Sequence, residues 1–196
     1  MVQNTPQRSF RVRLKIGFAL VLALFIGVTV VGLVRMAEAN RQIERIVEYN
    51  LQKRELASSV NVALLERLVS MHSLVVLADP FDREEESHRL REQGLRFLEG
   101  RHRLEEIATT AEERAILAKI RELAIATRPI TERVVEQALA GQIAQATETI
   151  RTEAIPAQAT IVRQVNDFIA IQQRETKKVV AEAASAYTNA QSLMLA

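Results

Sequence analysis

The sequence predicts an all-α protein, in which a transmembrane helix continues into an antiparallel up-down-up-down four-helix bundle. Few residues favour turns, since the 196 residues include only six Gly and four Pro, and a β-sheet protein of this length would need many more. An uncharged apolar stretch lies near the N-terminus, and further on the apolar residues recur with a helical period. The 26 basic and 24 acidic residues nearly balance, which argues against a nucleic-acid partner.

The apolar stretch, residues 16–34, predicts a membrane span. It contains no charged residue, and as a helix it would measure roughly 28 Å, close to the thickness of a bilayer's hydrocarbon core. Basic residues precede it without any acidic residue. Because positive charge favours the cytoplasmic side, we expect residues 1–15 to be cytoplasmic and the chain after the span to be extracytoplasmic. The basic residues are Arg8, Arg11, Arg13 and Lys15.

A cleaved signal peptide is the alternative interpretation of this segment. Ala37-Glu38-Ala39 has the small residues of a cleavage site. The apolar regions of signal peptides usually run about 7–15 residues, and this one is longer. Its length therefore favours an uncleaved anchor.

Two helices are expected directly after the span. The first has no Gly or Pro before Pro80, so it can run to about Ala78 and end at Asp79. The residue before a proline is pushed out of the helical region, and Asp is a good cap. A second helix fits residues 83–108.

Capping signals place the remaining helices. Thr110 and Glu113 have the spacing of a capping box, which predicts the start of a third helix. Gly141 is expected to end it. A short helical piece over residues 142–152 then leads to Pro156, a suitable first-turn residue for a fourth helix that continues to the end of the chain.

The end of the chain predicts a return to the membrane. Residues 191–196 are mostly apolar, and we expect them to begin a second, truncated transmembrane helix. The extracytoplasmic domain would then comprise residues 35–190.

The helical period predicts the bundle core and one surplus apolar stripe. One stripe of the first helix holds Val60, Leu64, Met71, Leu74 and Val75, and the other helices are expected to contribute Leu90, Phe97, Leu104, Ala108, Ile116, Ile120, Leu123, Ile130, Val134, Ala138, Ile161, Val165, Phe168, Val179 and Ala183. A second stripe lies nearly opposite on the first helix. One stripe is enough for a four-helix core, so the second predicts a homodimer along this helix. The stripe begins at Val47, and its predicted interface residues are Leu51, Val62, Leu65, Val69 and Val76.

Arg67 lies in the middle of the first stripe, where an unpaired guanidinium is costly. Counting helical rise places it level with Thr127 and with the segment from Gln158 to Gln164. It needs a carboxylate, carbonyl groups, water or an anionic ligand as a partner. The alternative is a structural arginine that bonds to Gln164 or a nearby Glu, or whose head reaches water. We take Arg67, Thr127, Gln158 and Gln164 as candidate ligand-binding residues.

No arrangement typical of an enzyme is found, and we expect no catalytic residue, metal or cofactor. The three histidines, His72, His88 and His102, lack the spacing of a helical zinc site. Runs of Glu occur where helices begin, and there negative charge is favoured by the helix dipole. Arg101, with Gln172 and Glu175, predicts a further internal Arg–Glu pair.

The helix boundaries resemble those of one family. The features that carry the resemblance are a basic N-terminus, one span, a break at residues 78–80, the Thr-Ala-Glu-Glu-Arg start at residues 110–114, an Ala-Gly break at residues 140–141 and a long last helix. In these features the chain resembles the four-helix-bundle sensory module of bacterial methyl-accepting chemotaxis receptors. The resemblance implies a dimer in the inner membrane with a periplasmic bundle. Binding of a small molecule, or of a periplasmic binding protein that carries it, would shift the last helix relative to the first.

The resemblance leaves the output open. The same module precedes histidine kinases and diguanylate cyclases, and we expect a cytoplasmic output domain that this sequence lacks. The arginine cluster with which related aspartate receptors hold a carboxylate is not evident, since Arg54 and Arg67 are far apart on the first helix. A membrane-anchored helical scaffold that binds proteins without sensing a ligand is the alternative function.

Overall fold

The computed structural model describes residues 7–195, so residues 1–6 of the predicted cytoplasmic segment and Ala196 lie outside the described residues. It divides the chain into two units: unit 1 comprises Met1–Ile46 and Ala183–Ala196, and unit 2 comprises Val47–Glu182. All regular structure in the described part is helical, which confirms the all-α prediction. The elements are α1 (Gln7–Val76), α2 (Pro80–Ile107), α3 (Ala111–Leu139), α4 (Ile143–Thr149), the π-helical segment η1 (Ile150–Ala154) and α5 (Ile155–Leu195).

Unit 1 contains the apolar stretch of α1. Every side chain from residue 16 to residue 34 is exposed. Among the described residues one helix is long and apolar enough to cross a membrane, and its apolar part lies near the N-terminus. In unit 1 α5 extends to Leu195, and the second span over residues 191–196 stays a prediction.

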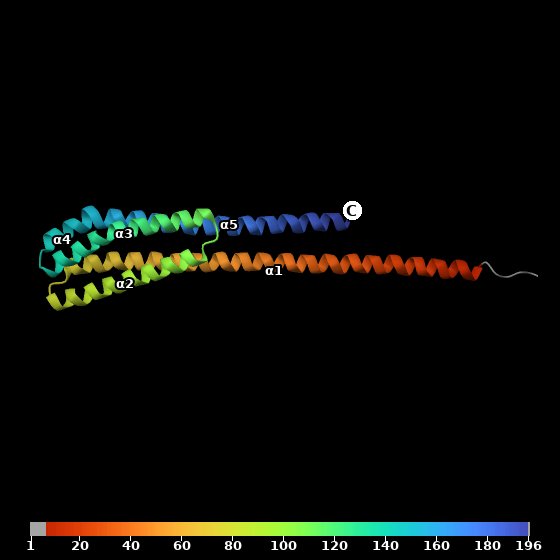
Figure 1. The fold of residues 1–196 in the computed structure, drawn as a ribbon, viewed down its shortest axis with the longest axis horizontal. Coiled ribbons are helices and arrows are strands. Elements are labelled where there is room, and N and C mark those ends of the chain that lie inside the picture. The colour runs from red at the N-terminus through yellow and green to blue at the C-terminus, as the bar shows by residue number, and fades with distance from the viewer. Residues whose placement is uncertain (1–6, 196) are drawn as a thin grey trace, which may run out of the picture. The chain divides into compact units, whose positions relative to one another are not determined.

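Unit 2 is a bundle of four helices joined by short turns (Figure 1). The part of α1 within this unit, α2, α3 and the continuous α4–η1–α5 segment supply the four. Tyr49 of α1 bonds to the end of α2 through the Ile107 carbonyl, and Arg174 of α5 pairs with Glu112 of α3. Turns at residues 77–79, 108–110 and 140–142 reverse the chain each time, so successive helices run antiparallel.

The helix boundaries follow capping chemistry. The Asp79 carboxylate accepts a hydrogen bond from the Phe81 amide at 2.8 Å, and Pro80 occupies the first turn of α2. α2 therefore begins three residues before the predicted start at residue 83. Thr110 and Glu113 form the predicted capping box of α3. Gly141 follows the end of α3 and has a φ of 76°, a left-handed conformation that favours glycine.

The expected break before Pro156 is wrong. α4, η1 and α5 follow one another without an interruption, and the Ile155 amide bonds to the carbonyl of Ile150, five residues back. Proline has no amide hydrogen and its ring crowds the carbonyl four residues earlier, which disfavours an ordinary helical turn. The wider π turn directly upstream accommodates the proline, and the helix continues.

The core of unit 2 consists of two apolar clusters. The first cluster is built around Leu64, Phe97, Ile120 and Phe168, and the second around Met71, Leu90, Val134 and Ile150. Most of the predicted core residues are buried here. The buried apolar residues shared with the prediction are Val60, Leu64, Met71, Leu74, Leu90, Phe97, Leu104, Ile120, Val134, Ala138, Ile161, Val165 and Phe168.

Candidate functional site

A layer of polar residues and glycine separates the two apolar clusters. In each helix of the bundle it lies between the residues of the first cluster and those of the second. We call these residues the polar layer: Arg67 of α1, Gly94 of α2, Thr127 and Thr131 of α3, and Gln158 of α5. The apolar core is therefore interrupted where the sequence placed Arg67 among apolar neighbours.

Arg67 is half-buried, and its hydrogen bonds are incomplete. One terminal nitrogen donates to the Thr131 hydroxyl at 3.3 Å, while Nε is buried and has no partner among the described residues. Burial lowers the pKa of the guanidinium from its usual value because removal from water disfavours the charged form. A planar group with five N–H donors is thus left with spare donor capacity inside the bundle.

The other predicted ligand residues are satisfied by the backbone or by a neighbour. Gln158 is buried and its amide donates to the Leu64 carbonyl of α1. The Thr127 hydroxyl donates to its own helix, at the Leu123 carbonyl. The side-chain amide of Gln164 donates to Asp167 one turn away. None of these three is hydrogen-bonded to Arg67 in the described structure, so Thr131 is the partner that sequence reasoning missed.

A cavity of about 400 Å³ opens beside Arg67. Side chains from α1, α2 and α3 line it, and three of them are arginines. Its volume falls within the usual range for a small-molecule site, roughly 300–1,000 Å³. The lining residues are Arg67, Leu90, Arg91, Gly94, Arg128, Thr131, Glu132, Val135 and Glu136.

A second polar group, the Lys53 cluster, joins three helices of the bundle. Lys53 of α1 and Glu113 of α3 form an ion pair at 2.7 Å, with side chains only 1% and 2% exposed. The Thr109 hydroxyl lies 2.9 Å from the Lys53 ammonium, and the Gln172 amide of α5 donates to Glu113 at 2.7 Å. The Tyr49 ring lies 4.7 Å from the ammonium and adds a cation–π contact.

Glu113 has two structural roles. Its carboxylate completes the α3 cap by accepting hydrogen bonds from the Thr109 and Thr110 amides, and it neutralises Lys53. Burial raises its pKa, but the hydrogen bonds from Lys53, the Thr110 amide, Gln172 and the Thr109 amide together lower the pKa to about 2. The carboxylate therefore stays ionised at neutral pH.

Arg101 forms an Arg–Glu pair, as predicted, but its partner is not Glu175 of α5. Arg101 forms its ion pair with Glu105 of its own helix at 2.6 Å, and Gln172 belongs to the Lys53 cluster. Lys53 was missed, although a signal existed: it precedes Val60 by two helical turns and so lies on the same apolar face of α1.

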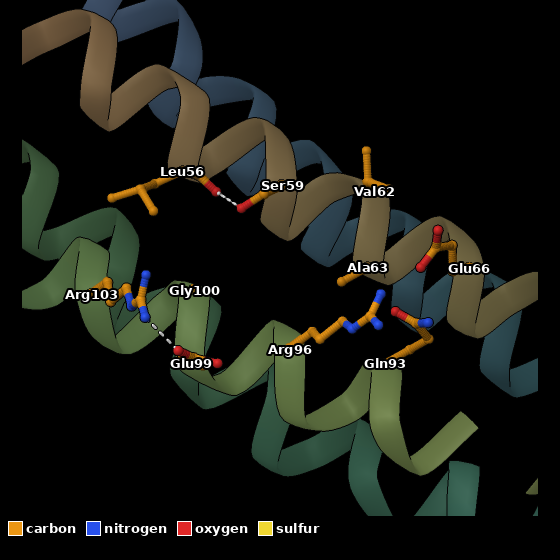
Figure 2. A pocket seen from close by; sticks show the side chains of 10 residues that line it. All are labelled: Leu56, Ser59, Val62, Ala63, Glu66, Gln93, Arg96, Glu99, Gly100 and Arg103. Carbon is orange, nitrogen blue, oxygen red and sulfur yellow. Dashed lines mark hydrogen bonds and ion pairs between the residues drawn. The ribbon is translucent and has the colours of Figure 1, made fainter. Parts of the chain in front are cut away.

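A groove of about 390 Å³ runs between α1 and α2 (Figure 2), and it shares no lining residue with the Arg67 cavity. Gly100 allows the two helices to approach closely, since a Cβ added there would lie 2.6 Å from a methyl group of Val60. Gln93, Arg96 and Glu66 supply polar side chains to the lining of the groove (Figure 2). The cations are paired within α2, Arg96 with Glu92 and Arg103 with Glu99.

The second apolar stripe of α1 is exposed in the single chain. Leu65 is 52% exposed and Val69 64%, while Val47 is half-buried. Val62 also borders the groove between α1 and α2 (Figure 2). The exposed members of the stripe are Leu51, Val62, Leu65, Val69 and Val76.

Two comparisons bear on function. The family model for a four helix bundle sensory module for signal transduction matches residues 9–187, nearly the whole chain. A comparison with curated proteins finds no match. Together with the apolar stretch of α1, the family match indicates a protein that associates with a membrane.

Proposed function

The chain belongs to the family of four-helix-bundle sensory modules for signal transduction, and from this premise we propose that it is the extracytoplasmic sensor of a chemoreceptor-type membrane protein. The observation that carries the proposal is the path of two helices. Both α1 and α5 have one part in the bundle of unit 2 and another in unit 1, where α1 has its apolar stretch.

The proposed topology follows from charge and length. Residues 16–34 cross the bacterial inner membrane as an uncleaved anchor, because the stretch is long enough to span the hydrocarbon core. Residues 1–15 stay in the cytoplasm with their basic side chains. The bundle then lies in the periplasm, and residues 191–196 begin a second span.

The proposed signal is a shift of α5 relative to α1. A ligand that binds one arrangement of the helices better than another shifts the population between them, and a difference of a few kcal/mol is enough. The ligand is a small molecule, or a periplasmic binding protein that carries one. A cytoplasmic output domain would read the shift; a chemotaxis signalling domain is our first proposal, and a histidine kinase or diguanylate cyclase is the alternative.

The exposed stripe of α1 supports a homodimer. An apolar face of this kind on a helix that already contributes to a core needs a partner, and a second copy provides one by symmetry. The same stripe also favours a second candidate function, a membrane-tethered scaffold that binds other proteins and senses no ligand.

A fusion protein tests the sensory role without a known ligand. Residues 1–190 are joined to the second span, linker and kinase domain of another membrane receptor, and kinase activity is measured in membranes. Gln172→Met removes the bond from α5 to Glu113 and keeps the side-chain volume. A hydrogen bond to a charged group is worth roughly 1.5–3 kcal/mol, so its loss should change the output about twofold or more.

Gln173→Met is the matched control, because Gln173 is the exposed neighbour on α5. Its output should equal that of the wild type. Equal outputs from the wild type, from Gln172→Met and from a fusion without residues 47–182 would contradict the sensory role and favour the scaffold.

A further inference from the structure

We propose that the cavity beside Arg67 is an anion-binding site that takes a single carboxylate or phosphate group of a small solute, with Arg67 and Arg91 as its cationic residues. The inference rests on the proposed function, since it identifies the chemical class of the sensed ligand. In this proposal, residues of α1, α2 and α3 contact the ligand, and Gln158 and Gln164 of α5 do not.

The first step is the unmet bonding capacity of Arg67. Its Nε is buried without a partner in the described part of the chain, and its bond to Thr131 is long, at 3.3 Å. None of the described carboxylates forms an ion pair with it. A buried donor without an acceptor is costly. An oxyanion can accept from Nε and a terminal nitrogen together, in the bidentate geometry that guanidinium groups favour.

The second step is the charge around the cavity. Arg128 is neutralised by Glu132 of its own helix at 2.8 Å. Arg91 is exposed and forms no ion pair with any described residue. The lining therefore carries three arginines and two carboxylates, Glu132 and Glu136, which gives it a net charge of +1. Glu132 and Glu136 at the exposed edge would repel an anion of higher charge, which limits the ligand to one anionic group.

The third step is the space beside the guanidinium. Gly94 lies in the middle of α2, where glycine weakens a helix relative to alanine. A Cβ added there would have Arg67 Nε as its nearest neighbour, at 4.0 Å, an ordinary contact without a clash. The glycine is thus not required by packing, and the methyl group of an alanine there would contact the unpaired nitrogen.

Thermal unfolding of the whole chain in detergent micelles tests the site. The unfolding temperature is followed by circular dichroism at constant ionic strength while acetate or inorganic phosphate replaces chloride. A ligand that binds only the folded state raises this temperature along a saturating curve. We expect saturation with at least one of the two probes. Acetate alone would identify a carboxylate ligand, phosphate alone a phosphorylated one, and either result supports the site.

Three variants make the test specific. Arg67→Met keeps the apolar stem and removes the charge, and we expect an apparent Kd about tenfold higher or more. Gly94→Ala should raise the unfolding temperature of the unliganded chain by a few degrees and still weaken anion binding several-fold. Arg96→Met makes the same chemical change in the groove between α1 and α2 (Figure 2), which shares no lining residue with the Arg67 cavity, and should leave the anion effect unchanged.

An anion effect of equal size in the wild type, Arg67→Met and Gly94→Ala would overturn the site, as would the absence of saturation with both probes. The sensory role is judged separately by the kinase fusion. A fusion that responds to Gln172→Met while no anion binds would remove only the ligand assignment. If the chain binds the anion but the kinase activity of the fusion does not change with the substitution or the deletion, the anion site stands and the sensory role does not.

Discussion

At the scale of single residues, two charged side chains interrupt the apolar stripe of α1 with different outcomes. Lys53 has a complete shell of partners, with Glu113 at 2.7 Å and Thr109 at 2.9 Å. Arg67 has one long hydrogen bond and an unpaired Nε. Removal of one partner from a buried ion pair leaves an uncompensated charge, which costs roughly 3–5 kcal/mol. We therefore infer that the Lys53 cluster stabilises the bundle and that Arg67 is the group available to a ligand.

The Glu113 pKa predicts an acid-dependent stability. This pKa lies at about 2 in the folded chain, against 4.5 for an ordinary glutamate. A lowered folded-state pKa stabilises the protein fully above the unfolded value, and the contribution is lost as pH falls from about 4.5 to about 2. Glu113→Gln should therefore be less stable at pH 7, by roughly 3 kcal/mol, and should lose less stability over that acid range. Urea unfolding at a series of pH values measures both effects.

Glu99→Gln is the control for this prediction. Its carboxylate is exposed and pairs with Arg103 at the surface of α2, where such pairs contribute about 0–1 kcal/mol. It should follow the wild-type curve. A Glu113→Gln curve parallel to the wild type between pH 4.5 and pH 2 would show that another group causes the acid sensitivity.

Residue positions on a helix could be predicted, but most of their partners could not. The 3.6-residue period placed Arg67 on the core face correctly, and it would have placed Lys53 there too. Glu113 follows Lys53 by 60 residues, and its position near a helix start already had an explanation as a cap. The choice of Thr131 over Thr127 as the partner of Arg67 depends on side-chain conformation, which periodicity does not contain.

At the scale of helices, local chemistry accounts for most boundaries. Asp79, the Thr110–Glu113 capping box and Gly141 each act within a few residues, so the sequence alone was sufficient. Pro156 was the exception. Whether a proline begins a helix or sits within one depends on the preceding turn, and here the π-helical segment at residues 150–154 keeps the helix continuous.

The exposed stripe of α1 predicts self-association. Leu65→Glu places a charge in the middle of the stripe, and it should weaken the dimer of the whole chain in detergent about tenfold or more, because a charge is costly to bury in an apolar interface. Sedimentation equilibrium measures the dissociation constant. Leu95→Glu is the matched control, since Leu95 is 66% exposed on α2 and lies outside the stripe. A strictly monomeric wild type, or equal effects of both substitutions, would contradict the proposed interface.

At the scale of the whole molecule, the proposed sensory function depends on the side of the membrane on which the bundle lies. The all-α fold and the bundle were predictable from the scarcity of Gly and Pro and from periodicity. The surplus stripe of α1 was predictable for the same reason. The ligand and the output were not, because helix boundaries and apolar faces specify a scaffold, and a recognition site depends on a few side chains.

Labelling of single cysteines tests the topology most directly, since the natural chain has no cysteine. Ser9→Cys lies before the predicted span, and Ser58→Cys lies at an exposed position of the bundle. In intact bacterial cells, a maleimide that reaches the periplasm but cannot cross the inner membrane should label Ser58→Cys, and it should label Ser9→Cys only after the cells are permeabilised. Labelling of Ser9→Cys in intact cells, with Ser58→Cys protected until permeabilisation, would contradict an extracytoplasmic sensor.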